Sequence, residues 1–245
     1  MFISEINMYL TELNTYIFSC HVSKHLYIND LTLLYSSCKA FRDVLDVDGL
    51  FIYTQICLHY LPHGCVNKDK GQFWYREGKL HRTGDQPAII KESGQYWYID
   101  GECHRDEDKP AIESANGGKF WYKHGNAHRE GDLPAKIWWN NTREWYKFGK
   151  CHRDGDMPAI IDSNGLQEWY MHDKCHRDGD LPAVVHTDGT REWYKHGNCH
   201  RDGDLPAIIN ADGTQEWYTN GECHREGKPA VIHADGTLEF YTHGR

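Results

Sequence analysis

The groups with the greatest chemical potential in this chain are a cysteine and a histidine that stand side by side. The segment CHRDGDLPA spans Cys199–Ala207 and recurs at Cys175–Ala183. A thiol beside an imidazole, followed by two aspartates, supplies the groups for nucleophilic thiol chemistry, for zinc ligation or for a structural turn. The number of copies, and the residues that replace the cysteine, distinguish these three interpretations.

Thiol catalysis requires one site in which the cysteine and the histidine meet. Within the repeats the Cys-His dipeptide instead occurs five times, and Leu80 and Ala127 stand at the cysteine position in two further units. Leucine and alanine suit a small apolar packing position. In an extended segment neighbouring side chains also point to opposite faces, so this thiol and this ring would not share a site. We expect a non-enzymatic protein with no catalytic residue.

Metal binding is also disfavoured by the spacing. Zinc sites bring close pairs of ligands to one tetrahedral centre, whereas here one Cys-His dipeptide occurs per 24 residues. Equivalent positions in stacked two-stranded units lie roughly 9–10 Å apart, which is too far for a disulfide. Ligation between units stays open. Asp-Gly-Asp resembles part of a calcium loop, but the downstream bidentate glutamate is missing. We expect no metal and no cofactor.

The third interpretation is a structural turn that repeats as a ladder. An arginine and an aspartate three positions apart are expected to pair across the glycine, while the histidine ring donates to a loop carbonyl. The ladder comprises His81, His104, His128, His152, His176, His200 and His224, with the pairs Arg153/Asp156, Arg177/Asp180 and Arg201/Asp204. Two copies depart from the pattern: CHRDEDKPA lacks the glycine, and CHREGKPA is one residue short and carries Lys228. A turn tolerates such changes better than a catalytic or metal site.

The same period organises most of the chain. An aromatic pair recurs with the histidines, at Trp74-Tyr75, Trp97-Tyr98, Trp121-Tyr122, Trp145-Tyr146, Trp169-Tyr170, Trp193-Tyr194 and Trp217-Tyr218. Pro-Ala recurs in step with it. A fixed period between 20 and 50 residues indicates a stacked repeat architecture. We predict seven units and a truncated eighth, from about residue 72 onward.

Each unit has the local signals of a β-hairpin. Asp188-Gly189 lies between two β-prone runs, which predicts a type I′ turn, and a connecting loop with the sequence CHRDGD follows. Because strand neighbours face opposite sides, we expect a tyrosine row on one face and a tryptophan row on the other. One row is expected to be packed, and the other to be partly available as a partner-binding aromatic ladder. The predicted fold is mainly β, an elongated array of about seven 24-residue hairpins spanning residues 66–245.

Residues 1–65 lack the repeat. Apolar residues between Ile28 and Pro62 recur at helical intervals, and Asp48-Gly49 marks a break. We predict a small helical domain that precedes the array.

Charge and composition restrict the partners. The net charge is −9 and no basic run is present, so neither nucleic acid nor an anionic membrane surface is favoured. No apolar stretch approaches the ~20 residues of a membrane span. The first twenty residues do not resemble an export signal, and the nine cysteines therefore suggest reduced thiols in a cytoplasmic compartment.

The unit WYKHGNCHRDGDLPAIINADGTQEWY (Trp193–Tyr218) resembles the MORN repeat family, with its aromatic, its spaced glycines and its Asp-Gly before the next aromatic. It is most similar to variant arrays of large DNA viruses of amoebae. The resemblance implies an elongated single-layer sheet of hairpins that acts as a scaffold, dimerises or binds partners. The constant HRDGDLPA block and the Trp-Tyr pair depart from the usual pattern.

The segment Leu31–Cys57 is similar to an F-box, although the usual opening Leu-Pro is missing. The positions that fit are Leu31, Leu33, Leu34, Cys38, Phe41, Leu45, Leu50 and Ile52. This resemblance implies that residues 1–65 recruit the linker subunit of a ubiquitin ligase. The other interpretation is a helical cap over the first hairpin.

Two functions therefore stand beside each other. The first is a protein-interaction repeat protein that acts as a substrate adaptor for a host ubiquitin ligase in the host cytoplasm. The second is a structural protein that associates with itself or with capsid proteins in a virion. Carbohydrate or choline recognition between aromatic hairpins is a third reading, which the lack of an export signal disfavours.

Overall fold

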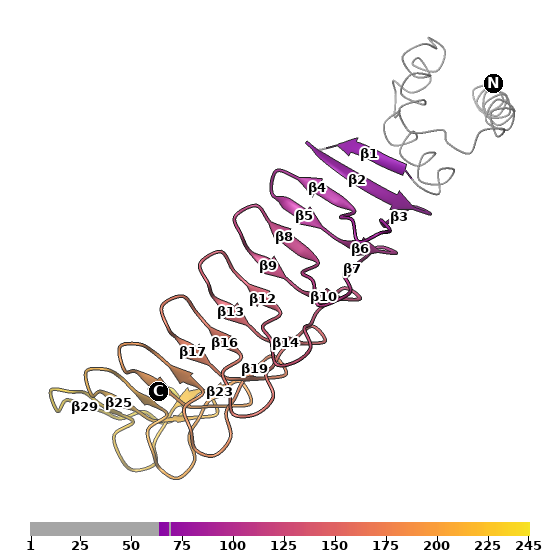
Figure 1. Cartoon of the computed structure of the whole chain (residues 1–245). Coiled ribbons are helices and arrows are strands. Elements are labelled where there is room, and N and C mark those ends of the chain that lie inside the picture. The colour runs from indigo at the N-terminus through magenta and orange to yellow at the C-terminus, as the bar shows by residue number, and fades with distance from the viewer. Residues whose placement is uncertain (1–63, 69) are drawn as a thin grey trace, which may run out of the picture. The chain divides into compact units, whose positions relative to one another are not determined.

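The computed structural model describes residues 64–68 and 70–245. The predicted helical domain and all of the F-box-like positions lie outside the described residues. The chain divides into one unit of Met1–Val66 with Trp74–Lys79, and a second of Asn67–Phe73 with Leu80–Arg245. The second unit is a stack of antiparallel β-hairpins, and the prediction of a mainly β hairpin array is confirmed (Figure 1).

Every repeat contributes two hairpins rather than the single hairpin and loop expected from the sequence. The long hairpins contain β4 (Ile89–Lys91), β5 (Gly94–Tyr96), β8 (Ile112–Ser114), β9 (Lys119–Phe120), β12 (Lys136–Ile137), β13 (Arg143–Glu144), β16 (Ile160–Ile161), β17 (Gln167–Glu168), β20 (Val184–Val185), β21 (Arg191–Glu192), β24 (Ile208–Ile209), β25 (Gln215–Glu216), β28 (Val231–Ile232) and β29 (Leu238–Glu239). They pair edge to edge in chain order, so consecutive units share one antiparallel sheet.

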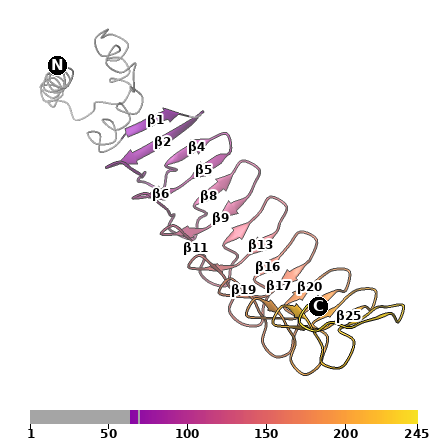
Figure 2. The same cartoon turned by 180° about the vertical axis from the view of Figure 1, so that it is seen from behind.

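The short hairpins are separate two-stranded ladders. They contain β6 (Tyr98–Ile99) with β7 (Glu102–Cys103), β10 (Tyr122–Lys123) with β11 (Asn126–Ala127), β14 (Tyr146–Lys147) with β15 (Lys150–Cys151), β18 (Tyr170–Met171) with β19 (Lys174–Cys175), β22 (Tyr194–Lys195) with β23 (Asn198–Cys199), and β26 (Tyr218–Thr219) with β27 (Glu222–Cys223). The remaining strands are β1 (Gly64–Lys68), β2 (Gly71–Arg76) and β3 (Lys79–Leu80). Seen from behind, the hairpins keep the same order along the stack (Figure 2). The described residues contain no helix long and apolar enough to span a membrane.

The turn of the long hairpin is not of type I′, which corrects the prediction from Asp188-Gly189. Only Gly189 has a positive φ (98°), and its N–H donates to the carbonyl of His186. The next residue, Thr190, pairs through its carbonyl with the His186 N–H. This is the three-residue loop in which a type I turn is followed by a left-handed residue. Glycine fits that last position because it has no Cβ to clash.

The type I′ turn lies in the short hairpin, at the second glycine of each unit. Lys195 pairs with Asn198, and both residues between them have positive φ, 53° at His196 and 93° at Gly197. The same two-residue loop occurs with His172 and Asp173 in the unit that lacks this glycine. A residue other than glycine is tolerated at position 173 because aspartate adopts the left-handed conformation more readily than most residues.

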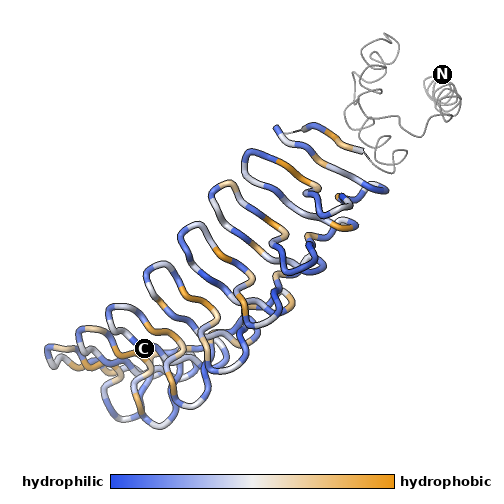
Figure 3. Tube along the Cα trace, in the orientation of Figure 1, coloured by the Kyte–Doolittle hydropathy of each residue, from blue (hydrophilic) through white to orange (hydrophobic). Residues whose placement is uncertain are grey.

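The core is a narrow column of alanine and tryptophan. The alanine of every Pro-Ala pair is fully buried: Ala88, Ala111, Ala135, Ala159, Ala183, Ala207 and Ala230. The strand is interrupted at tryptophan, whose backbone N–H donates to the alanine carbonyl of the next Pro-Ala pair, as Trp169 does to Ala183 at 2.8 Å. Apolar residues accordingly recur as short stretches between hydrophilic ones along the tube (Figure 3).

Candidate functional site

The CHRDGD loops join neighbouring units, which corrects the pairing expected inside one loop. Arg177 donates to Asp156 of the preceding loop through Nε at 2.6 Å and Nη2 at 2.8 Å. Its guanidinium lies 3.8 Å from the ring centroid of Trp169, and Nη1 donates to the Pro182 carbonyl. The same arrangement recurs for Arg129, Arg153, Arg201 and Arg225 with Asp108, Asp132, Asp180 and Asp204. Each arginine therefore holds two units together.

These ion pairs shift the carboxylate pKa values. Hydrogen bonds from Arg105 and Lys109 lower the pKa of Asp85 to about 2. Lys109 belongs to the loop that lacks glycine, and Lys228 of the shortened loop bonds Asp204 in the same way. The two departures from the sequence pattern thus each add a second cation to the preceding unit's aspartate.

The histidines also connect units, but not through a loop carbonyl as expected. His176 bonds the Asp178 carboxylate through Nε2 at 3.1 Å, and its Nδ1 accepts the N–H of His196 from the next unit. The two imidazole rings stack with their centroids 4.5 Å apart. Equivalent contacts to the next unit are made by His81, His104, His128, His200 and His224.

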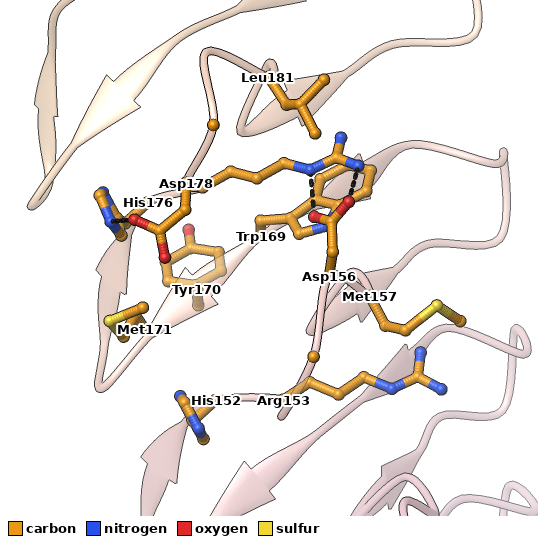
Figure 4. A pocket seen from close by; sticks show the side chains of 13 residues that line it. His152, Arg153, Asp156, Met157, Trp169, Tyr170, Met171, His176, Asp178 and Leu181 are labelled. Carbon is orange, nitrogen blue, oxygen red and sulfur yellow. Dashed lines mark hydrogen bonds and ion pairs between the residues drawn. The ribbon is translucent and has the colours of Figure 1, made fainter.

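One of these joints differs from the others and borders a space of about 320 Å³ (Figure 4). Asp156 does not adopt the left-handed φ of its counterpart Asp180. The Trp169 Nε1–H, whose equivalent in Trp193 donates to the Asp180 carbonyl, has no acceptor. The Nδ1 of His152 is likewise buried without a partner, although its ring stacks on His172.

The cysteine and the histidine of one dipeptide belong to different environments. Cys175 lies directly opposite Tyr170 in the short hairpin, whereas His176 bonds the Asp178 carboxylate and the next unit. Burial raises the pKa of Cys175 to about 12, and the pKa of Cys103, Cys151 and Cys199 to the same value. These thiols are therefore protonated at neutral pH. The nucleophilic form of cysteine is the thiolate, so they are not activated nucleophiles. Within the described residues no group of three or more His, Cys, Asp and Glu side chains is placed to hold a metal ion.

The two aromatic rows differ in burial. The packed row is the tryptophans: Trp97, Trp121, Trp145, Trp169, Trp193 and Trp217 are only 6–7% exposed. The partly available row is the tyrosines, because Tyr98, Tyr122, Tyr146, Tyr170, Tyr194 and Tyr218 are half-buried. Trp74 and Tyr75, at the start of the repeat, are both half-buried. Of the residues expected to bind partners, the tyrosines thus have the accessible edges.

A third row, which the sequence reasoning did not single out, crosses the long-hairpin sheet on one face. Its members lie directly opposite one another in successive strands, and such residues share a face. In chain order this central row is Phe73, Ile89, Tyr96, Ile112, Phe120, Lys136, Glu144, Ile160, Glu168, Val184, Glu192, Ile208, Glu216, Val231 and Glu239. The residue before each aromatic pair is aromatic in the first three units and glutamate in the rest, a signal visible in the sequence.

The central row and the tyrosine row meet at a groove of about 420 Å³. The Tyr194 hydroxyl donates to Glu192 at 3.0 Å, and Tyr218 donates to Glu216 at 3.1 Å. Burial raises the pKa of these phenols, so they remain hydrogen-bond donors at neutral pH. The groove therefore brings carboxylates and aromatic edges together, with Lys174 and His186 also in its lining.

No protein-family model, no curated protein and no solved structure matches this chain.

Proposed function

We propose that this chain is a non-enzymatic, protein-binding repeat protein. The observation that carries the proposal is the groove in which the half-buried tyrosines meet the glutamates of the central row. Tyrosine is a favourable interface residue, because it offers a large contact area with little side-chain entropy to lose. The arginines and histidines of the constant loops are engaged in joining units, whereas the tyrosine edges are accessible to a partner.

The role proposed for the array is that of a MORN-like substrate-binding region in an F-box-type adaptor. Residues 1–65 would recruit the ubiquitin-ligase linker subunit, and the array would hold the protein to be modified. The support is the sequence resemblance of Leu31–Cys57 together with the repeat. This proposed role implies that the protein acts in the cytoplasm.

The test is affinity capture from a host-cell extract with the full chain and two sets of substitutions. Phe41→Asp is expected to lose the linker subunit while retaining the proteins held by the array. Tyr194→Ala with Tyr218→Ala is expected to lose those proteins while retaining the linker subunit. If the wild-type chain captures neither class, the adaptor function is wrong.

A structural, self-associating role is favoured by a different observation. The loops present a row of exposed apolar side chains: Leu133, Met157, Leu181 and Leu205 are 41–49% exposed. Polar Lys109 and Lys228 stand in the loops at either end of this row. A second copy or a capsid protein is the candidate partner for this surface. Analytical ultracentrifugation tests self-association through this surface. The double variant Leu181→Lys with Leu205→Lys is expected to be a monomer where the wild-type chain is an oligomer.

A further inference from the structure

The acidic half of the central row alternates glutamate with an aliphatic residue from strand to strand. Glu168 lies opposite Val184, Val184 opposite Glu192, and the same alternation of glutamate with an aliphatic residue continues to Glu239. One strand lies between successive glutamates, so they are two inter-strand spacings apart. The inter-strand spacing of antiparallel sheets therefore places successive glutamates about 9.5 Å apart.

Most of these carboxylates are already partnered within their own hairpin. His186 bonds Glu192 at 2.7 Å, Asn210 bonds Glu216 at 2.8 Å and His233 bonds Glu239 at 2.8 Å. Each of these three also accepts the hydroxyl of the tyrosine two residues further along the chain. These contacts hold the three carboxylates in fixed positions along the central row.

Glu168 differs from them. The position that supplies histidine or asparagine elsewhere is Asp162, whose carboxylate instead accepts the N–H groups of Asn164 and Leu166 in the turn. Within the described residues Glu168 has no hydrogen-bond donor to its carboxylate. It is half-buried, and desolvation raises its pKa. A half-buried carboxylate without a donor gains free energy when a ligand brings a cationic N–H donor to it.

The groove around Glu168 combines acidic, aromatic and basic side chains. Tyr170, Tyr194 and Glu192 line it, and so do Lys174 and His186, the latter bonded to Glu192. Aromatic rings attract ammonium and guanidinium groups, and a neighbouring carboxylate adds a Coulombic attraction. Lys136 already occupies the equivalent place at the first glutamate of the row, 3.9 Å from the ring centroid of Tyr146 and 3.5 Å from Glu144. The chain thus contains one internal example of a cation held between this carboxylate and this tyrosine.

The interval of the row selects the conformation of the ligand. A polyproline II segment advances about 3.1 Å per residue with three residues per turn, so every third side chain recurs on one side after about 9.3 Å. A β-strand repeats its side after about 6.7 Å, and an α-helix after about 5.4 Å. Of these three shortest repeats, the polyproline II repeat is the one that matches the spacing of the glutamates.

We propose that the acidic half of the central row, with the tyrosines beside it, binds a basic polyproline II segment of a partner protein that carries lysine or arginine at every third position. The segment lies along the stack and places one cationic side chain per unit, the tightest at Glu168. This proposal rests on the protein-binding function above and specifies the partner's chemistry.

The experiment compares two peptides of identical composition against the full chain by fluorescence anisotropy. The first is (Lys-Pro-Pro)₅, whose lysines match the interval, and the second is Lys₅Pro₁₀, whose lysines are contiguous. The matched peptide is expected to bind at least fivefold more tightly, and raising the salt concentration is expected to weaken it. Equal affinities for the two peptides, or no binding of either, would overturn the proposal.

Substitutions locate the binding. Glu168→Gln is expected to weaken the matched peptide about tenfold, because a charge-assisted hydrogen bond becomes a neutral one. Glu226→Gln removes the same charge from an exposed loop residue and is the control, with an expected change of less than twofold. Circular dichroism confirms that both variants fold. An unchanged affinity in Glu168→Gln would overturn the assignment to this row.

The experiments can refute the basic polyproline II ligand without refuting the protein-binding function. If both peptides fail, yet affinity capture still recovers partners that Tyr194→Ala with Tyr218→Ala loses, the protein-binding function stands and the basic polyproline II ligand is wrong. If capture also fails, both are wrong.

Discussion

The two halves of the central row have the same backbone and opposite chemistry. In the first three units the residue before the aromatic pair is Phe73, Tyr96 or Phe120, and Phe120 packs edge-on against Trp138. In the later units the same position is glutamate, and every one of these glutamates except Glu168 is hydrogen-bonded within its own hairpin. Lys136 lies at the boundary between them.

This contrast separates what holds the array together from what varies on it. The buried alanines, the tryptophans and most of the arginine joints are common to both halves. The central row changes from aromatic to acidic without altering the strand register. The fold is therefore stabilised by the constant positions, and the central row is available for specificity.

The largest expected effect tests whether the constant positions stabilise both halves equally. Trp97→Ala in the aromatic half and Trp193→Ala in the acidic half should each lower the free energy of unfolding by about 3–5 kcal/mol, because each removes a buried indole and leaves a cavity. Urea denaturation measures both. A cost confined to one half would show that the two halves do not share one core.

The next effect tests the row itself. Phe120→Glu should lower the free energy of unfolding by about 2 kcal/mol, because a half-buried ring is exchanged for a carboxylate beside Trp138. The reciprocal Glu168→Phe should be neutral or stabilising, because it removes a half-buried carboxylate that has no hydrogen-bond donor. If Phe120→Glu and Glu168→Phe lowered the free energy of unfolding equally, the difference in chemistry between the two halves would have no effect on stability.

A pH titration sharpens the same comparison. Asp85 has a pKa lowered to about 2 by its cations, so its contribution to stability is complete above about pH 4 and is lost as the pH falls towards 2. Glu168 has a raised pKa, so its ionisation destabilises the fold at neutral pH and its protonation relieves this. Glu168→Gln should therefore exceed the wild type in stability at pH 7, and the difference should vanish near pH 4. Urea midpoints across this range measure it, and a constant difference would contradict the role of ionisation.

The smallest effect concerns one loop of the aromatic half. Glu107 has a φ of 61°, where the other complete loops have glycine, and Asp108 beside it is also left-handed. Glu107→Gly should raise the free energy of unfolding by up to about 1 kcal/mol, because glycine adopts this conformation without the Cβ clash. Gly179→Glu in the acidic half should lower it by a similar amount. Thermal denaturation measures the stability change of both variants. The explanation requires that Glu107→Gly is stabilised and that Gly179→Glu is destabilised.

Much of the array was predictable from the residues alone. The period of the histidines and the aromatic pairs predicts stacked units, and the β-prone runs beside Asp188-Gly189 predict hairpins. The type I′ turn was predicted for the long hairpin but lies in the short one. A dipeptide such as Asp-Gly fits a turn with one positive φ as well as a turn with two, so its sequence does not distinguish them. The prediction that cysteine stands at a packing position agrees with burial of Cys151, Cys199 and Ala127.

The sequence by itself determined the length of the unit and which residues make its turns, because both depend on local conformational preference. Only the tertiary structure decided that Arg177 pairs with Asp156 rather than Asp180, that tryptophan is the packed row, and that five glutamates form one line. The reason is register. These contacts join neighbouring units, and their partners are set by how one hairpin stacks on the next rather than by any spacing within a unit.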